Sequence, residues 1–540
     1  MHSYLFKYSN YSMRDYEKKL ALLELQSIWG KVRYEKRKNS ICINTNRSVQ
    51  KERLEDLTFF SEVTYKNGSQ DISVIPRQVK HELSAKVLKS KIDDIHHRDI
   101  YELIVNGKSN SRELRYLTHL MHEYKGRYNP QLCKALINIA NIDKCSLVLD
   151  PFVGSGTTLV ECLLNGYCGL GLDLNPLSYL ITKVKIESLY LDMRLLKIKT
   201  DALIQTLQRK KDEHSIRSRD INSFYSEVAT HFPIDLDYLI RWFPRGNLIS
   251  ILNIMTEILK ISDTRLRNLF MLVLSDILIN ISYQDPNQLR IMRRSEDKVS
   301  KDVYGLYANN LKRYCNIVST YQLVKTNRLK NTVYNYLGDV RNLQKELGLS
   351  DSSVDLIVTS PPYATALPYI DTDRLSLALM GYVNRTSLRN LETQMIGNRE
   401  ITQQKKEKLE EQLLIDTILP KSIKQLIIKI YNLNRKSNVG FRRKNTAALL
   451  YKYFSDMNQA MSEMYKVLRE RKFCFMVVGC NNTIAGDKNI FIPTDDCISE
   501  IGKSVGFKFN SKIPLNIPLS YMIHKKNAIR RESILIFRKN

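Results

Sequence analysis

The chain has 540 residues, 43% of them hydrophobic, and its 83 Lys and Arg against 56 Asp and Glu give a formal net charge of +27 at pH 7. This surplus favours a nucleic-acid partner, because each neutralised phosphate releases counterions; a solvated basic surface is the alternative. Nine cysteines without paired spacing argue against zinc and a disulfide framework. The absence of a signal-peptide pattern and of ~18 uninterrupted apolar residues predicts a soluble cytoplasmic protein, and we expect no metal.

Residues 1–75 are predicted to form a small α/β domain, and the charged stretch 76–116 to form a helical linker. The elements expected in the first domain are strands over 3–8 and 40–45, a helix over 15–28 that Gly30 ends, and a turn at Asn67-Gly68.

From residue 117 onward, short apolar strands alternate with amphipathic helices, which is typical of an α/β sheet. The expected strands are 146–149, 168–172, 333–337, 354–358, 473–478 and 533–537, and the expected helices are 130–139, 157–164, 447–468 and 495–505. Two insertions interrupt this pattern. The predicted segments are core at 117–190, a helical insertion at 191–330, core at 331–382, a basic insertion at 383–446, and C-terminal core strands at 447–540.

The sharpest feature is the glycine loop of LVLDPFVGSGTT, residues 147–158. A strand ends at Asp150, and Gly154 and Gly156 then allow a tight turn and the close approach of a ligand. Asp173 ends the next strand about 20 residues further on, where an acidic residue accepts hydrogen bonds from ribose hydroxyls in nucleotide-binding α/β folds. An ordinary strand–turn–helix junction is the alternative.

The chemistry of this loop favours a cationic ligand. It lacks the Lys-Ser/Thr ending of a phosphate-binding loop, departs from GxGxxG, and contains no basic residue. S-adenosylmethionine carries a sulfonium and an ammonium group, and Asp150 is expected near its amino-acid end. Thr157 and Thr158 are expected to cap the helix that follows.

A second motif, DLIVTSPPY at 355–363, places two prolines after an apolar strand. The prolines hold the backbone extended at the carboxyl end of the strand, where open α/β sheets bind ligands. The exocyclic amine of a base is a poor nucleophile. The Ser360 hydroxyl and the Pro361 carbonyl are placed to accept its hydrogen bonds, and Tyr363 to stack on a flipped base. A Pro-Pro turn is the alternative.

Together these stretches resemble motifs I, II and IV of the amino-methyltransferases that act on DNA bases. The segment HEYKGRYNPQLCKALI at 122–137 resembles the motif that precedes motif I. The resemblance implies a Rossmann-like S-adenosylmethionine-dependent methyltransferase sheet. The cofactor-binding residues it implies are Tyr128, Asn129, Pro130, Asp150, Phe152, Gly154, Ser155, Gly156, Asp173 and Asp339. The catalytic residues it implies are Ser360, Pro361, Pro362 and Tyr363.

A leading Ser at position 360 is the form associated with N4-cytosine enzymes, whereas Asp or Asn is typical of N6-adenine enzymes. The resemblance therefore implies a cytosine-N4 DNA methyltransferase in restriction–modification or phage defence, with a restriction endonuclease or another defence component as a possible partner. Adenine N6 stays open as the target.

The N-terminal stretch YLFKYSNYSMRDYEKKLALLELQSIWG, residues 4–30, resembles the start of THUMP-containing tRNA guanine-N2 methyltransferases. An RNA base amino-methyltransferase, acting on tRNA or rRNA, is therefore the alternative. A nucleic-acid-binding protein with an inactive methyltransferase fold is a third hypothesis, and the intact motifs argue against it.

Basic residues in both insertions are candidates for contact with nucleic acid, against the alternative of solvated charge. They are Arg290, Arg293, Arg294, Arg442, Arg443 and Lys444. Just after the SPPY motif, one or more of Tyr369, Asp371, Asp373 and Arg374 is placed to hold the target strand, and a capped helix start is the alternative.

Overall fold

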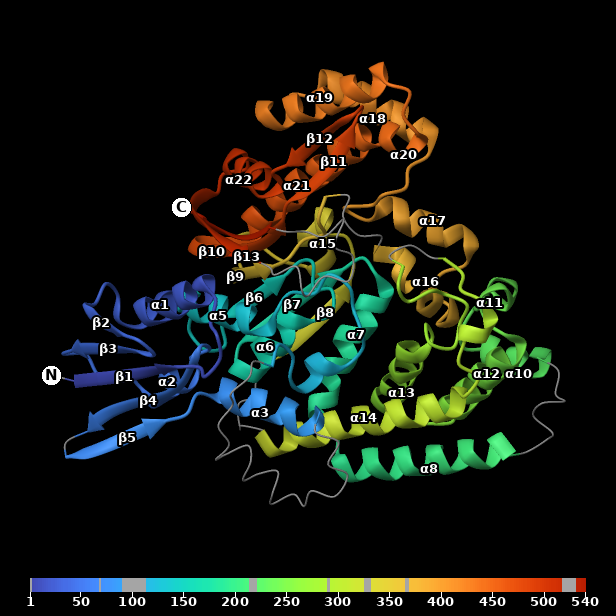
Figure 1. Cartoon of the computed structure of the whole chain (residues 1–540), viewed down its shortest axis with the longest axis horizontal. Coiled ribbons are helices and arrows are strands. Elements are labelled where there is room, and N and C mark those ends of the chain that lie inside the picture. The colour runs from blue at the N-terminus through green and yellow to red at the C-terminus, as the bar shows by residue number, and fades with distance from the viewer. Residues whose placement is uncertain are drawn as a thin grey trace.

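A seven-stranded sheet forms the centre of the protein (Figure 1). The computed structural model describes residues 2–67, 69–89, 113–212, 221–288, 292–324, 332–364, 369–516 and 531–540. The strand order is β13-β14-β10-β9-β6-β7-β8, and the five strands from β10 to β8 are parallel. Their bounds are β6 Leu147–Asp150, β7 Cys168–Asp173, β8 Val333–Leu337, β9 Val354–Thr359, β10 Leu468–Gly479, β13 Lys508–Asn516 and β14 Arg531–Arg538. The predicted α/β fold class is confirmed.

Alternate residues of the central strands belong to two different hydrophobic cores, as a pleated sheet covered on both faces requires. On one face, Val148, Leu356 and Phe475 share a core with helices α1 (Asp15–Trp29) and α5 (Pro130–Ala140). On the other face, Leu149, Ile357 and Met476 share a core with α21 (Thr446–Val467) and α22 (Thr494–Ser504). The short helices η4 (Val340–Asn342) and α15 (Leu343–Leu347) add to this second core.

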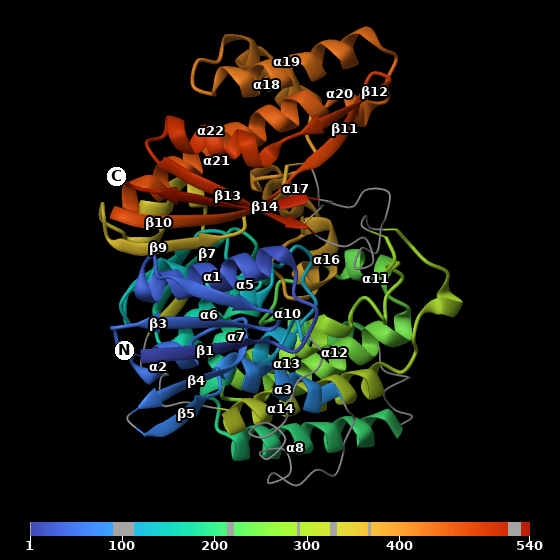
Figure 2. The same ribbon diagram turned by 60° about the vertical axis from the view of Figure 1, so that its left-hand side comes forward.

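A second, antiparallel sheet is built from the N-terminal residues, in the order β2-β3-β1-β4-β5. Its strands are β1 His2–Tyr8, β2 Tyr34–Arg37, β3 Ser40–Thr45, β4 Phe60–Asn67 and β5 Gln70–Val74, and α2 (Lys51–Glu55) precedes β4. Tyr4 and Phe6 pack against Trp29, with ring centroids 5.3 and 5.7 Å apart. Since α1 contacts α5, this sheet lies beside the first face of the central sheet (Figure 2).

Three predicted details near the N-terminus have clear outcomes. Gly30 ends α1 with a φ of +76°. Asn67 pairs with Gln70 in a hairpin, while Gly68 lies outside the described residues. Of the segment 76–116, predicted as a helical linker, the structure describes α3 (Arg77–Lys89) and residues 113–116, and residues 90–112 lie outside the described part; η1 (Leu117–Leu120) follows this segment.

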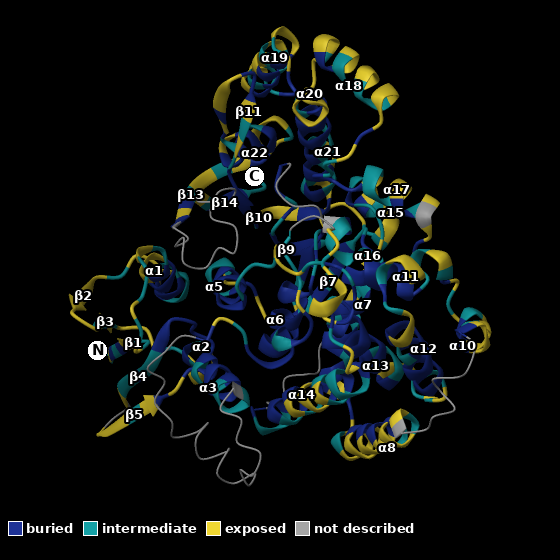
Figure 3. Cartoon of the chain, turned by 45° about the vertical axis from the view of Figure 1, so that its right-hand side comes forward, coloured by how far each residue is buried: buried dark blue, intermediate teal, exposed yellow. Residues whose placement is uncertain are grey.

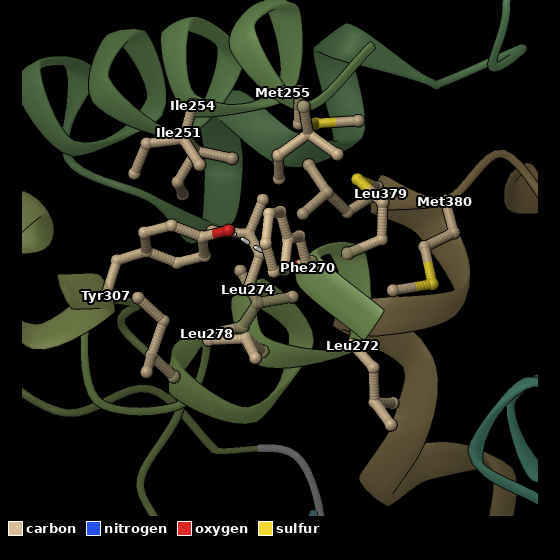
Figure 4. Close-up of a cluster of buried hydrophobic side chains, with 14 of the residues drawn as sticks. Ile251, Ile254, Met255, Phe270, Leu272, Leu274, Leu278, Tyr307, Leu379 and Met380 are labelled. Carbon is tan, nitrogen blue, oxygen red and sulfur yellow. Dashed lines mark hydrogen bonds between the residues drawn. The ribbon is translucent and has the colours of Figure 1, made fainter. Parts of the chain in front are cut away.

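The described part of the first insertion is helical, and it packs onto α7 (Pro176–Glu187) to form a large apolar core. After η2 (Ser188–Tyr190), its elements are α8 Met193–Asp212, α10 Ile221–Ala229, α11 Leu236–Trp242, α12 Arg245–Leu259, α13 Thr264–Ile277, η3 Glu296–Lys298 and α14 Val303–Val324. Figure 4 shows Phe270 of α13 among Ile251, Leu274 and Tyr307, with Leu379 and Met380 reaching the same cluster. The Tyr307 hydroxyl donates to the Phe270 carbonyl at 3.2 Å. We call these helices the helical layer.

The second insertion extends from α16 (Tyr369–Leu379) to the upper end of the molecule in Figure 1. Its helices are α17 Arg385–Gln394, α18 Gln403–Ile415, α19 Lys421–Lys436 and α20 Phe441–Lys444. Helices α18 and α19 contact α21, and α19 also contacts a hairpin of β11 (Asn481–Ala485) and β12 (Lys488–Ile492). Figure 3 shows α18 largely exposed and the central strands buried. Among the described helices, none is both long and apolar enough to cross a membrane.

Candidate active site

Four adjacent parallel strands bring the two sequence motifs together at one edge of the sheet. Strand β6 lies between β9 and β7, and β8 follows β7. Val148 pairs with Leu356, so the carboxyl ends of β6 and β9 are neighbours. The glycine loop after Asp150 therefore lies beside the SPPY residues after Thr359, although 209 residues separate these two positions. This is the edge at which open α/β sheets bind ligands.

A single pocket opens at this edge. Nine of the predicted residues line it: Tyr128, Phe152, Gly154, Ser155, Asp173, Asp339, Ser360, Pro361 and Pro362. Five predicted residues do not line it: Asn129, Pro130, Asp150, Gly156 and Tyr363. Further lining residues are Tyr124, Gly126, Arg127, Pro151, Val153, Thr157, Leu174, Gly338, Val340, Gln394, Met395 and Ile396.

The glycine loop begins the helix α6 (Thr157–Asn165) in a conformation that needs glycine. Gly154 has a φ of +50° and Gly156 a φ of +79°, in the left-handed region that L residues with side chains rarely adopt. At Gly156 a Cβ atom would lie 2.9 Å from the Thr182 side chain. At Gly154 it would lie 3.3 Å from the ring of Tyr124, which packs over the loop. The backbone thus reaches the pocket without a side chain in between.

The carboxylate of Asp150 is directed into the protein and away from the pocket. It accepts the hydroxyl hydrogens of Thr158 at 2.5 Å and Thr359 at 2.6 Å. The backbone N–H of Phe152 donates to it at 3.2 Å. Burial raises the pKa of Asp150 to about 6. Asp150 therefore joins the glycine loop to β9, a role different from the expected place beside the ligand's amino-acid end.

The expectation that threonine side chains cap α6 is wrong. Gly156 is the N-cap residue, and no side chain caps the helix. Thr158 is turned toward Asp150 and also bonds the Tyr128 hydroxyl. A hydroxyl in the first turn of a helix is free to bond such a buried carboxylate, and Thr158 makes this bond in place of a capping interaction.

Asp173 presents its carboxylate to the pocket from the end of β7. It accepts the backbone N–H groups of Gly154 at 2.8 Å and Asn175 at 2.9 Å, which fix its orientation. Burial raises the pKa of Asp173 to about 6. The Asn175 side chain in turn donates to Asp373 at 2.7 Å, so this acidic position is tied to the helix that follows the SPPY motif.

Asp339 lines the opposite part of the pocket and is held by one arginine. The Arg341 guanidinium donates to it at 2.6 Å, and the Arg341 backbone N–H at 3.0 Å. Burial acts to raise the pKa of Asp339, but the hydrogen bonds from Arg341 outweigh it and lower the pKa. Arg341 also donates to the Gln394 carbonyl at 2.8 Å, which fixes the second insertion beside the pocket.

The segment before the glycine loop forms one wall of the pocket, and only some of the residues in this wall were predicted. Tyr128 lines the pocket, whereas Asn129 caps α5 by accepting the Gln131 N–H at 2.9 Å, and Pro130 is the first residue of that helix. Tyr124 and Arg127 line the pocket and were missed. Both belong to the segment 122–137, which resembles the motif that precedes motif I. Treating every residue of this segment as a candidate would have identified them.

The SPPY residues are rigidly held. The Ser360 hydroxyl donates to the Val477 carbonyl at 3.1 Å, which leaves the lone pairs of its oxygen available. The Pro362 carbonyl accepts the Tyr453 hydroxyl at 3.0 Å. The Tyr363 hydroxyl donates to Glu532 at 3.0 Å, and burial raises the pKa of Glu532. Tyr363 is thus packed behind the motif instead of facing the pocket, which differs from the expected stacking position.

The second insertion contributes Gln394, Met395 and Ile396 to the pocket wall, and none of them was predicted. The Lys452 ammonium donates to the Met395 carbonyl at 3.2 Å, and Gly397 approaches Pro362 closely. No local sequence pattern marks these three residues, because their place depends on contacts with Arg341 of η4, with α21 and with the SPPY loop.

The predicted basic residues fall into different environments. Arg293 and Arg442 line one shared cleft between the two insertions. Arg294 is turned inward and donates to the carbonyls of Ile279 at 2.7 Å and Asn280 at 2.8 Å. The remaining predicted residues are Arg443 and Lys444, which are exposed outside this cleft, and Arg290, which lies outside the described residues. Among the residues that the structure describes, no group of three or more His, Cys, Asp or Glu side chains could hold a metal ion.

Comparison with known proteins agrees with this site. Residues 7–183 match a family model described as DNA methylase; this match includes the glycine loop and Asp173 and does not extend to the SPPY motif. The type II methyltransferase M.MvaI of Kocuria varians is 26% identical over 423 residues, which cover 75% of this chain and 86% of that protein. M.BsoBI of Geobacillus stearothermophilus, also a type II methyltransferase, is 23% identical over 428 residues, 72% of this chain and 78% of its own.

Among solved structures, TrmN from Thermus thermophilus aligns over 100% of both chains at 9% identity, with a TM-score of 0.30. The family match over residues 7–183 and the type II relatives confirm the resemblance of this chain to the amino-methyltransferases that act on DNA bases.

Proposed function

We propose that the protein transfers a methyl group from S-adenosylmethionine to the exocyclic N4 amine of cytosine in DNA. Methylation of an amino group in DNA is supported by the DNA methylase match and by the type II methyltransferase relatives. The choice of cytosine N4 rests on the leading Ser360 of the SPPY motif.

S-adenosylmethionine is the cofactor, and the pocket fits it. The Ser155 hydroxyl lines the pocket, is buried, and has no hydrogen-bond partner within the described part of the protein, as expected of a group that meets a ligand. Asp173 offers carboxylate oxygens suited to ribose hydroxyls, and Gly154 lets the backbone approach. When bound, the cofactor supplies an electrophilic methyl group on its sulfonium.

The protein's part in the chemistry is to orient the amine. The lone pair of an exocyclic amine is delocalised into the base, so the nitrogen must become pyramidal before it can attack. In the proposed arrangement, the Ser360 oxygen and the Pro361 carbonyl accept hydrogen bonds from the amine and direct its lone pair into the pocket. Val477 fixes the Ser360 hydroxyl, and Tyr453 fixes the Pro362 carbonyl, so this edge is positioned before substrate binds.

The observation that carries the proposal is the convergence of the two motifs. Ser360, Pro361 and Pro362 share one pocket with the glycine loop and with Asp173. A methyl donor held by the loop and an amine held by the SPPY edge would face each other there. A site for cofactor alone would not need the SPPY edge as its wall.

Methyl transfer to unmethylated DNA tests the proposal. The purified protein is incubated with tritiated S-adenosylmethionine and either DNA made by amplification or bulk tRNA. Label in DNA is expected. Label in tRNA alone would overturn the DNA assignment and favour the RNA alternative.

A matched pair of variants links transfer to the SPPY edge. Pro362→Ala keeps the carbonyl that Tyr453 bonds but frees the backbone, and we expect transfer to fall by about 100-fold or more while the cofactor still binds. Ile418→Ala, at an exposed position of the second insertion, should leave both unchanged.

We also propose a biological role in restriction–modification, which the type II relatives support. DNA treated with the active protein should become resistant to a nuclease that cuts at the methylated sequence, and DNA treated with Pro362→Ala should stay sensitive. If the two DNA samples are cut equally, this role is wrong.

A further inference from the structure

A second cavity lies between the two insertions. Its wall is formed by α11 of the first insertion, by α16 after the SPPY loop and by α17 of the second insertion, which lie together on the right of Figure 1. Five arginines from separate parts of the chain line it: Arg241, Arg293, Arg374, Arg389 and Arg442. We call this cavity the arginine cleft. Of these, Arg293, Arg374 and Arg442 were candidates from the sequence, whereas Arg241 and Arg389 were not.

Two donors in the arginine cleft have no acceptor. The Nε of Arg374 and the hydroxyl of Tyr238 are buried and have no hydrogen-bond partner among the described residues. The Arg374 guanidinium lies 5.8 Å from the centre of the Tyr238 ring, and its nearest carboxylate, Asp371, is 3.6 Å away. Buried donors are almost always satisfied in folded proteins, so an oxygen-rich ligand is the natural partner for this pair.

The charge of the cleft is positive. Five arginines face three carboxyl groups, those of Asp371, Glu392 and Glu400. Burial, followed by the nearby Asp371, raises the pKa of Glu392 to about 7, so this carboxyl is partly neutral near pH 7. Arginine presents a planar set of donors that matches phosphate oxygens, and four of the five arginines are exposed to an incoming ligand.

The arginine cleft is joined to the active-site pocket at two points of the chain. Helix α16, which carries Asp371 and Arg374, starts at Tyr369, shortly after the SPPY motif. Helix α17 carries Glu392 in the cleft and ends at Gln394, which lines the pocket. A nucleotide rotated into the pocket keeps its flanking phosphates outside, so basic groups on the helices that connect the pocket and the cleft are suited to hold the neighbouring backbone.

We propose that the arginine cleft binds the phosphodiester backbone of the target DNA strand next to the flipped base, with Arg374 and Tyr238 donating to one phosphate. The other arginines contact adjacent phosphates, so the cleft positions the strand without reading its sequence. This inference rests on the proposed function and names the surface that holds its substrate.

The test compares two double variants by fluorescence anisotropy with labelled duplexes. Arg293→Ala/Arg442→Ala removes two exposed cleft charges. Arg194→Ala/Arg209→Ala removes two exposed charges from α8, a helix that lies away from α11, α16 and α17 in Figures 1 and 2. We expect the cleft variant to bind duplex DNA about tenfold more weakly and to lower the slope of log affinity against log salt by about 1.8, at roughly 0.9 per phosphate contact. The α8 variant should match the wild type.

A third variant, Tyr238→Phe, removes only the unpartnered hydroxyl. It keeps the aromatic ring, so the packing of α11 is retained. It should raise KM for DNA several-fold while the Kd for S-adenosylmethionine stays the same. The loss should be equal on G·C-rich and A·T-rich duplexes, because backbone contacts carry no sequence information.

Wild-type affinity and salt slope in the cleft variant, or a loss confined to one sequence, would overturn the proposal. The wild-type protein separates this failure from failure of the proposed function. A wild type that neither binds nor methylates DNA contradicts the proposed function itself, whereas a wild type that methylates DNA beside an unaffected cleft variant contradicts only the cleft.

Discussion

In the sequence, both insertions interrupt the strand–helix alternation of the sheet, but in the structure they have different roles. The helical layer of the first insertion packs an apolar core onto α7, and none of its described residues lines the active-site pocket. The second insertion supplies Gln394, Met395 and Ile396 to that pocket. Both contribute arginines to the arginine cleft.

This difference shows that the role of an insertion depends on which part of the protein its buried residues contact. Phe270 and Leu274 of the helical layer are fully buried, so that layer is part of the folding unit of the sheet. The second insertion also shares an apolar core with α21, through Ile423, Ile427 and Ile430 of α19, but polar bonds of Arg341 to Gln394 and of Lys452 to Met395 fix the segment that lines the pocket. We therefore expect substitutions in the helical layer to change stability, and substitutions in this pocket-lining segment to change cofactor affinity.

The largest expected effect is in the helical layer. Phe270→Ala removes a fully buried ring, and we expect the free energy of unfolding to fall by about 3–5 kcal/mol. The Kd for S-adenosylmethionine of the folded protein should not change. Urea unfolding and calorimetry measure the two quantities, with the exposed Ile198→Ala of α8 as control, expected within about 0.5 kcal/mol of wild type. A large change in Kd would break the comparison.

Asp173→Asn provides the reference for a direct effect on the cofactor. Loss of a charged acceptor for ribose hydroxyls should weaken binding by about 1.5–3 kcal/mol, roughly 10- to 150-fold in Kd. Stability at pH 7 should not fall, because the substitution removes a carboxylate whose charged form burial disfavours. Unchanged Kd by titration calorimetry would mean that Asp173 does not contact the cofactor.

The pH dependence of binding sharpens the same point. Burial raises the pKa of Asp173 to about 6 in the free protein, and the ionised form is the acceptor, so affinity should fall as pH decreases through about 6. The sign for folding is opposite. Because the folded-state pKa lies above 3.8, this group's contribution to stability is present at low pH and lost as pH rises through about 6. Asp173→Asn should show a flatter binding profile, and an unaltered profile would contradict this origin.

Two neighbouring arginines test the comparison inside the first insertion. Arg294 donates to backbone carbonyls, and Arg294→Ala should remove these charge-assisted hydrogen bonds to partly exposed acceptors at a cost of about 1–2 kcal/mol in unfolding free energy. Arg293 is exposed in the arginine cleft, and Arg293→Ala should change stability by less than about 0.5 kcal/mol. Equal stability losses for the two variants in urea unfolding would contradict a structural role for Arg294 that Arg293 does not share.

The smallest effect is expected in the second insertion. The side chain of Gln394 is exposed yet lines the pocket, so Gln394→Ala should leave stability unchanged. It should weaken cofactor binding by about 0.5–1.5 kcal/mol, two- to tenfold in Kd, through the loss of a polar contact. The backbone carbonyl that Arg341 bonds is retained. If binding is unaffected while Phe270→Ala weakens it, the assignment of roles to the insertions is reversed.

Local signals in the sequence predicted the motif elements well. The strand that ends at Asp150, the proline that starts α5 and the glycine that ends α1 follow from local backbone preferences. Missed strands have physical causes. All four residues of β2 are exposed, so its sequence shows no alternation. Strand β13 contains Pro514 and lies at the sheet edge, where proline is tolerated.

The sequence predicted the positions of those site residues whose contacts lie close by in the chain. Asp150 turns inward because Thr359, far along the chain, offers it a hydroxyl. Tyr363 turns away from the pocket because Glu532 accepts its hydrogen bond. Gln394 reaches the pocket through Arg341. Each of these depends on a partner that no local pattern in the sequence identifies.

The identity of the methylated nucleoside is the measurement closest to the central claim. DNA incubated with the protein and S-adenosylmethionine is digested to nucleosides and separated by mass spectrometry. N4-methylcytosine in DNA treated with the wild type, and its absence after treatment with Pro362→Ala, is the predicted result. N6-methyladenine would contradict the choice of base, and a methylated nucleoside found only in RNA would contradict DNA as the substrate.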